Sequence, residues 1–165
     1  MEYLVRKAET GDMPRMEEIY ARARAFMVRT GNPNQWGTTH PPKTRLELDI
    51  AEGNLYVITA GNEIHGVFAF LVGEDPTYRM IYHGAWHSER PYGTIHRVAG
   101  DGSGGILHTA VEFAGQRCDY LRIDTHQDNT VMQRAIKKQG FQKCGTILTD
   151  DGTPRIAYDL ILGGE

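Results

Sequence analysis

The period of the apolar positions changes several times along the chain, and each change predicts a boundary between secondary-structure elements. Short apolar or alternating runs predict strands, and apolar residues three and four positions apart predict helices. The runs 54–60 and 63–72 flank Gly61-Asn62 and therefore predict a hairpin. The expected strands are 3–8, 54–60, 63–72, 94–99, 120–124, 142–148 and 155–161, and the expected helices begin near Asp12, Lys43, Gly105 and Asn129.

This order of elements predicts the fold class. A strand and two helices precede antiparallel strands, and a strand–helix–strand–helix–strand–strand series follows. We expect an α/β (α+β) fold with a mixed, mostly antiparallel sheet and helices on both faces. At 165 residues, with 40% hydrophobic content, the chain suits one domain over residues 1–165.

A glycine cluster stands between the strand 94–99 and the helix that follows it. Four glycines fall within the six residues Gly100–Gly105. At a helix start, bare backbone presents unpaired N–H groups, and the helix dipole adds positive charge. The cluster therefore predicts a site for a pyrophosphate.

A second motif lies one strand further along. Asp128 or Asn129 is expected to cap a helix, and Gly140 is expected to end it in the left-handed conformation. Together, the strand 94–99, the glycine turn and the run from Asn129 to Gly140-Phe141 resemble the GNAT superfamily of acyl-CoA-dependent N-acetyltransferases. As an order of elements the resemblance covers roughly residues 3–161, and its specific part covers about fifty residues.

The resemblance implies acetyl-CoA as co-substrate. In the family the sheet splays apart at the cofactor cleft, between the strand before the glycine turn and the next parallel strand, and pantetheine lies in the gap. Lys138 is a further candidate for the cofactor's phosphates, although the helix dipole alone accounts for a lysine there. The candidate cofactor-binding residues are Val98, Ala99, Gly102, Ser103, Gly104, Gly105, Ile106, Asn129 and Lys138.

The glycines also fit a dinucleotide-binding fingerprint, G-x-G-x-x-G, with Asp124 near the place of a ribose-binding acid. That alternative would make the protein a nicotinamide-dependent oxidoreductase. Too few strand–helix units follow the fingerprint, and the hairpin before it disagrees with parallel strands. An acyl-CoA-binding sensor without catalysis is the other alternative.

Acetyl transfer to an amine requires a group that takes a proton, because an alkyl ammonium has a pKa near 10. His96 lies two residues before Val98 and therefore on the same strand face, and imidazole titrates near neutrality. A purely structural role for His96 is the alternative. Asp124 and His126 form a second candidate catalytic pair, with bracing of the turn into Asp128 as the alternative for Asp124. In many family members a tyrosine acts as the acid at the position of Ile136, so the general acid is left unassigned.

Two long stretches are irregular: residues 30–42 carry one tryptophan, and residues 74–92 carry several aromatic side chains. Loops as long as 74–92 in a compact domain are typically functional or disordered, and the aromatic content of that stretch argues against disorder. By resemblance they flank the acceptor mouth. Trp36, Trp86 and Tyr92 are therefore candidate substrate-binding residues, with plugging of the core edge as the alternative for the tryptophans.

Charge and cysteine content narrow the function classes. The net charge is −3 with both signs mixed, so neither nucleic acid nor a membrane surface is expected as partner. No signal pattern or long apolar run is evident, which predicts a cytoplasmic protein. With two cysteines, and with His83 and His87 in a glycine-containing loop, no metal site is expected. The expected function is transfer of acetyl from acetyl-CoA to an amine of a small molecule or peptide, by a chain that could also form a homodimer.

Overall fold

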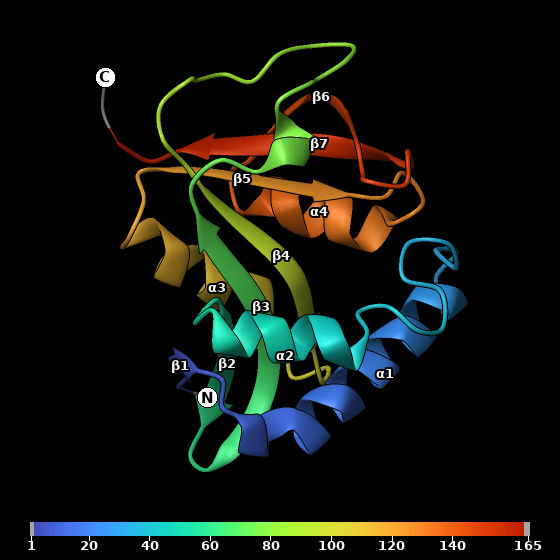
Figure 1. The fold of residues 1–165 in the computed structure, drawn as a ribbon, viewed down its shortest axis with the longest axis vertical. Coiled ribbons are helices and arrows are strands. Elements are labelled where there is room, and N and C mark those ends of the chain that lie inside the picture. Colours follow the sequence, from blue (N-terminus) through green and yellow to red (C-terminus); the bar gives the residue numbers. More distant parts are fainter. Residues whose placement is uncertain (1, 164–165) are drawn as a thin grey trace.

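A computed structural model describes residues 2–163, which form one seven-stranded sheet (Figure 1). The strand order is β1-β2-β3-β4-β5-β7-β6, and β4 and β5 are the only neighbours that run parallel among the described strands. The strands are β1 Leu4–Lys7, β2 Leu55–Ala60, β3 Glu63–Val72, β4 Gly93–Gly100, β5 Tyr120–Thr125, β6 Gln142–Leu148 and β7 Pro154–Ile161. The expected fold class, mixed and mostly antiparallel, is confirmed.

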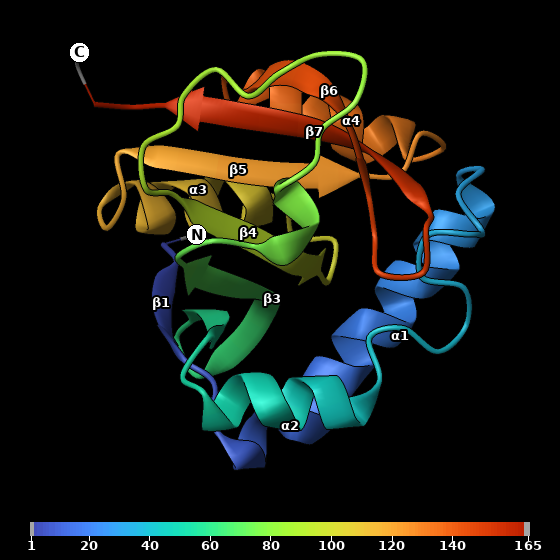
Figure 2. The same cartoon turned by 45° about the horizontal axis from the view of Figure 1, so that its top comes forward.

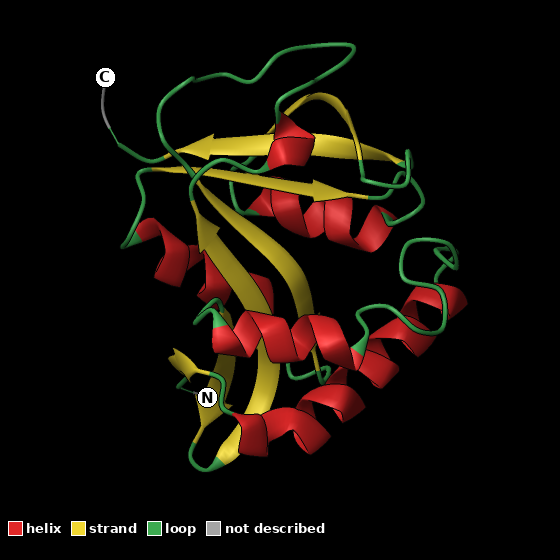
Figure 3. Cartoon of the chain, in the orientation of Figure 1, coloured by secondary structure: helices red, strands yellow, loops and turns green. Residues whose placement is uncertain are grey.

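Four α-helices accompany the sheet, α1 Met13–Arg29, α2 Lys43–Ala51, α3 Ile106–Gly115 and α4 Thr130–Lys138 (Figure 3). Short 3-10 turns η1 and η2 cover Thr10–Asp12 and Pro76–Tyr78. The expected helix signals recur in the structure: Asn129 caps α4 by accepting from the Met132 N–H, and Gly140 ends it at φ +98°. No helix among residues 2–163 is long and apolar enough to cross a membrane.

The two faces of the sheet are covered by different helices, because side chains alternate along a strand. On β2, Leu55 and Val57 pack in one core with residues of α1 and α2, whereas Ile58 packs in the other with residues of α3 and α4. On β3, Val67 and Phe68 divide between the cores in the same way. The helices therefore sandwich the sheet.

The sheet opens between its two parallel strands. β4 and β5 pair only at Gly93–Leu121 and Thr94–Arg122, although β4 continues to Gly100 and β5 to Thr125. Figure 2 shows β5 and β7 diverging from β3 and β4 beyond this point. The backbone edges released by this splay form the walls of the site.

Candidate functional site

A groove of about 700 Å³ lies where the glycine turn meets the start of α3, with α1 and α4 as its other walls. Gly102, Gly104 and Gly105 have φ values of +92°, +90° and +75°, which a residue with a Cβ rarely adopts. Gly105 is the N-cap of α3, and no side chain of the described residues caps it. The first N–H groups of α3 therefore remain available to an anion.

The candidate cofactor residues mostly converge on this groove. It is lined by Val98, Ala99, Gly102, Gly104, Gly105, Ile106, Asn129 and Lys138. Ser103 does not line it, because its hydroxyl donates to Asp101 Oδ1 at 2.6 Å and lies 3.1 Å from His65 Nδ1. Asn129 already uses its side chain, since Oδ1 caps α4 and Nδ2 donates to Gln35.

Arg22 is a groove residue that the sequence analysis missed. A Cβ built on Gly102 would lie 2.6 Å from Arg22 Nη2, so the guanidinium lies directly against the glycine turn. Arg15, Arg22 and Arg29 are seven residues apart on α1, a spacing that puts three cations on one helical face. This seven-residue spacing is the sequence signal from which Arg22 could be identified. Arg22 and Lys138 add positive charge on two sides of the uncapped helix end.

A second pocket, of about 460 Å³, occupies the splay between β4 and β5. His96 and Asp124 line it, as do the loop that carries Trp36 and the β6–β7 turn. Figure 2 shows this loop, in light blue, approaching the β6–β7 turn, in red-orange. The pocket meets the groove at four shared residues, Met27, Val98, Asn129 and Met132. A ligand in the groove can thus reach a second ligand in the pocket.

His96 forms a dyad with a loop carboxylate. Its Nε2 lies 2.9 Å from Asp75 Oδ2, and Asp75 is held by the Thr77 N–H and hydroxyl. Burial by itself raises the pKa of Asp75, but hydrogen bonds from His96 and Thr77 outweigh it and lower that pKa to about 2. An ionised carboxylate at Nε2 keeps a hydrogen there, so in a neutral ring Nδ1 carries the lone pair.

Asp124 and His126 do not form the expected pair. Asp124 Oδ2 accepts from the Tyr78 hydroxyl at 2.6 Å, and burial followed by the charge of Asp124 raises the tyrosine pKa well above its usual value. The ring of His126 turns back onto its own loop, where Nδ1 accepts from the Asp128 N–H. His126 lines neither the groove nor the pocket.

A bulge in β4 lies between His96 and the groove. Ala69 pairs with His96 and Val67 with Ala99, so Arg97 and Val98 stand together opposite Phe68. Arg97 adopts φ +53°. Its guanidinium makes bonds of 2.9 and 3.2 Å to the fully buried Asp49 of α2, and its carbonyl accepts from the Tyr20 hydroxyl of α1. The bulge leaves the Val98 backbone without a partner in the β3 register.

Unpaired polar atoms concentrate in the second pocket. Among the described residues, five buried side-chain atoms lack a hydrogen-bond partner, and four belong to residues that line it: Thr94 Oγ1, Thr125 Oγ1, Arg45 Nε and Arg155 Nη1. Buried polar atoms normally have partners, so this concentration indicates a site for a polar ligand. Arg155 makes no ion pair within residues 2–163, whereas Arg45 and Arg97 both contact Asp49.

The three candidate aromatic residues lie in different places. Trp36 lines the pocket and packs edge-on against Tyr20, with ring centroids 5.6 Å apart. Trp86 and Tyr92 instead enclose Arg122, each with its ring centroid 4.0 Å from the guanidinium carbon. They line a different cavity, together with Tyr78. The structure therefore does not place Trp86 or Tyr92 at the second pocket, since loop residues 79–92 fold over Arg122 of β5.

Solved structures resemble this chain over nearly its whole length. A GNAT-family acetyltransferase from Streptococcus agalactiae is 28% identical, with 98% of this chain and 96% of that chain covered and a TM-score of 0.86. A GNAT-family acetyltransferase from Listeria monocytogenes is 18% identical, with 98% and 96% covered and a TM-score of 0.68. YncA from Salmonella typhimurium, determined with its cofactor acetyl-CoA, is 16% identical, with 99% and 95% covered and a TM-score of 0.62.

The similarity to these proteins is one of three-dimensional structure. Neither the protein-family models nor the curated proteins give a match to the sequence.

Proposed function

Because this chain has the fold of the GNAT acetyltransferase superfamily, we propose that it transfers the acetyl group of acetyl-CoA to a primary amine. The observation that carries the proposal is the junction of the two cavities at Val98 and Asn129, between an uncapped helix and a histidine–carboxylate dyad. Acetyl-CoA supplies the activated acyl group. The chain's own residues bind the pyrophosphate and remove the proton from the amine.

The groove fits the phosphates of CoA. The bare glycine turn lets an anion approach the free N–H groups of α3, and the Arg22 guanidinium beside Gly102 adds the charge that the turn itself lacks. The groove then runs along Val98 and Ala99 of β4 to the second pocket. A thioester that follows this path ends at the bulge.

His96 is the proposed base. His96 lines the second pocket, and Asp75 keeps the ring hydrogen on Nε2. Nδ1 can therefore accept a proton from an ammonium directly or through water. The backbone N–H of Val98 is the proposed donor to the developing oxyanion, since the bulge frees this residue from its β3 register. No single residue is proposed as the acid. The position at which many family members carry a tyrosine acid is Ile136 here, and this side chain is fully buried in the core.

The second pocket favours an amine that also carries an acidic group, on a small molecule or a peptide. Asp75 and Asp124 provide negative charge for the ammonium end. Arg155, with its buried and unbonded Nη1, provides a cation for a carboxylate or phosphate. The hydroxyls of Thr94 and Thr125 offer further hydrogen bonds.

Two measurements test this function. Calorimetry with CoA, acetyl-CoA and NADPH should show binding of the first two alone, since the site is expected to recognise the acyl carrier. Thiol release from acetyl-CoA should then be screened over matched amines, such as amino acids and their amides, with faster release for the acidic member. CoA binding without thiol release from any amine would favour the sensor alternative, and tight NADPH binding would favour the dinucleotide alternative.

A further inference from the structure

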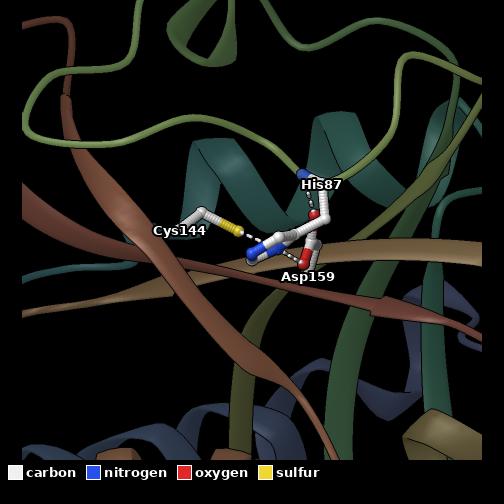
Figure 4. A group of neighbouring side chains, drawn as sticks. All are labelled: His87, Cys144 and Asp159. Atoms are coloured by element: carbon white, nitrogen blue, oxygen red, sulfur yellow. Dashed lines mark hydrogen bonds and ion pairs between the residues drawn. The ribbon is translucent and has the colours of Figure 1, made fainter.

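Three side chains with metal-binding atoms meet beneath loop residues 79–92, away from both cavities of the proposed active site. His87 comes from the loop, Cys144 from β6 and Asp159 from β7 (Figure 4). Their ligand atoms all lie within 4.8 Å of one another, with His87 Nδ1 at 2.7 Å from Asp159 Oδ1 and 3.3 Å from Cys144 Sγ.

The loop is held in register against β6. Tyr82 and Thr146 exchange backbone hydrogen bonds of 2.8 Å, and the Ala85 N–H donates to the Cys144 carbonyl. Gly84 makes this approach possible, because a Cβ there would lie 1.8 Å from the Cys144 carbonyl oxygen. The close backbone contact fixes the position of His87 relative to Cys144.

The carboxylate of Asp159 is already oriented. Its Oδ2 accepts from the Tyr120 hydroxyl at 2.7 Å and from the His87 N–H at 2.8 Å, and Arg122 Nε donates to the same tyrosine oxygen. Only Oδ1 faces the cluster. Metal-ligating carboxylates are held by such second hydrogen bonds, which fix the free oxygen toward the ion.

The same geometry argues against a nucleophilic triad. In a Cys–His–Asp triad the two partners bind different ring nitrogens, whereas here Cys144 and Asp159 both approach Nδ1 of His87. A cation among the three atoms would displace two hydrogens, the one on the Cys144 sulfur and the one that His87 Nδ1 directs at Asp159.

We propose that His87, Cys144 and Asp159 form a zinc site of the three-ligand type. Sulfur, imidazole nitrogen and carboxylate oxygen together match the ligand preference of Zn²⁺, and water can complete a tetrahedron. On binding, the Cys144 thiol loses its proton to solvent, and the neutral imidazole carries its hydrogen on Nε2. The His87 side chain is 41% exposed, which gives the ion a path of entry, while Cys144 and Asp159 are buried.

The ion would join the loop to the β6–β7 edge of the sheet. Trp86 and Ser88, the immediate neighbours of His87, contact the Arg122 side chain, so the fastened segment also covers this buried cation. We therefore expect the ion to stabilise the loop against the sheet, independently of acetyl transfer.

Co²⁺ and Zn²⁺ added to chelator-treated protein test the site. We expect one ion per chain and, with Co²⁺, the strong tetrahedral absorption and the thiolate-to-cobalt charge-transfer band of a cysteine-containing site. Cys144→Ala should abolish the charge-transfer band, and His87→Ala should weaken Zn²⁺ binding at least about tenfold. Cys118→Ala and His83→Ala are matched controls that should bind like the unmodified protein.

Tyr120→Phe tests the orienting hydrogen bond and should weaken Zn²⁺ binding by about 10-fold to 100-fold without removing the charge-transfer band. Circular dichroism on each variant separates loss of binding from loss of fold. An octahedral cobalt spectrum without a charge-transfer band, or equal Zn²⁺ affinity for Cys144→Ala and the unmodified protein, would overturn the proposal.

Discussion

Replacement of His96 by glutamine removes the proposed base while keeping a polar side chain in the pocket. The ring is partly buried, with its side chain 24% exposed, and within residues 2–163 its side chain makes one hydrogen bond, to Asp75. We therefore expect little loss of stability and a decrease in kcat of about 100-fold to 10,000-fold, the usual contribution of a positioned base. In activation free energy this is about 2.7–5.4 kcal/mol.

Asp75→Asn should have a smaller effect of the same kind. The amide leaves His96 in place but no longer requires a hydrogen on Nε2, so part of the population carries its hydrogen on Nδ1. We expect a decrease in kcat of about 10-fold to 100-fold, or about 1.4–2.7 kcal/mol.

The assay is thiol release from saturating acetyl-CoA, followed against pH with the best acceptor. Loss of the base should flatten the acidic limb of the kcat profile for His96→Gln. His83→Gln, an exposed loop histidine, is the control and should retain full activity. If His96→Gln keeps more than about half of the activity, or keeps the same acidic limb, the proton does not pass through His96.

Further predictions concern the cofactor, the acceptor and stability. Gly104→Glu should abolish acetyl-CoA binding in calorimetry, and undiminished affinity of this variant would remove the glycine turn from the cofactor site. Arg22→Ala should weaken acetyl-CoA binding about tenfold or more, whereas the control Arg134→Ala should bind like the unmodified protein. Arg155→Ala should raise KM about tenfold or more for acidic amines alone; an equal rise for neutral amines would remove its proposed anion contact. The pKa of Asp75 is about 2 in the folded protein against an ordinary 3.8, so its ionised form stabilises the fold fully above about pH 4 and loses this effect as the pH falls toward 2. Urea titrations should therefore show that the free energy of unfolding falls by about 1 kcal/mol over this range in the unmodified protein. Asp75→Asn should lack this loss. Ile136→Ala should lower the free energy of unfolding by about 2–5 kcal/mol without a new pH dependence of turnover, whereas a freely exposed residue at this position would lose almost nothing.

Local signals predicted most of the fold. The glycine turn, the Asn129 cap and the hairpin at Gly61-Asn62 each depend on conformations that neighbouring residues impose. The order of strands and helices follows from their periodicity, and the structure reproduces that order. What the periodicity could not supply is the bulge, because Arg97 belongs to an apparently regular alternating run and its left-handed backbone depends on partners from α1 and α2.

The site was predicted less completely, because its decisive contacts join distant residues. His96 was identified from its strand, but Asp75 is 21 residues earlier in an irregular loop and gives no periodic signal. The sequence predicts Trp86 and Tyr92 at the acceptor because, by resemblance to the family, their loop flanks the acceptor mouth. In the structure both rings pack on the buried Arg122 instead, because a cation between two aromatic faces stabilises the loop against the sheet.

The bulge at Arg97 connects the two halves of the proposed active site. A left-handed conformation at a residue other than glycine costs about 1 kcal/mol or more, and it persists only where surrounding contacts compensate. Here Asp49 and Tyr20 provide those contacts, so α1 and α2 determine where β4 bends. On either side of this bend, His96 lines the second pocket and Val98 lies on the border of both cavities. Because α1 also carries Arg22, one helix positions the proposed phosphate contact and the strand at which the two ligands would meet.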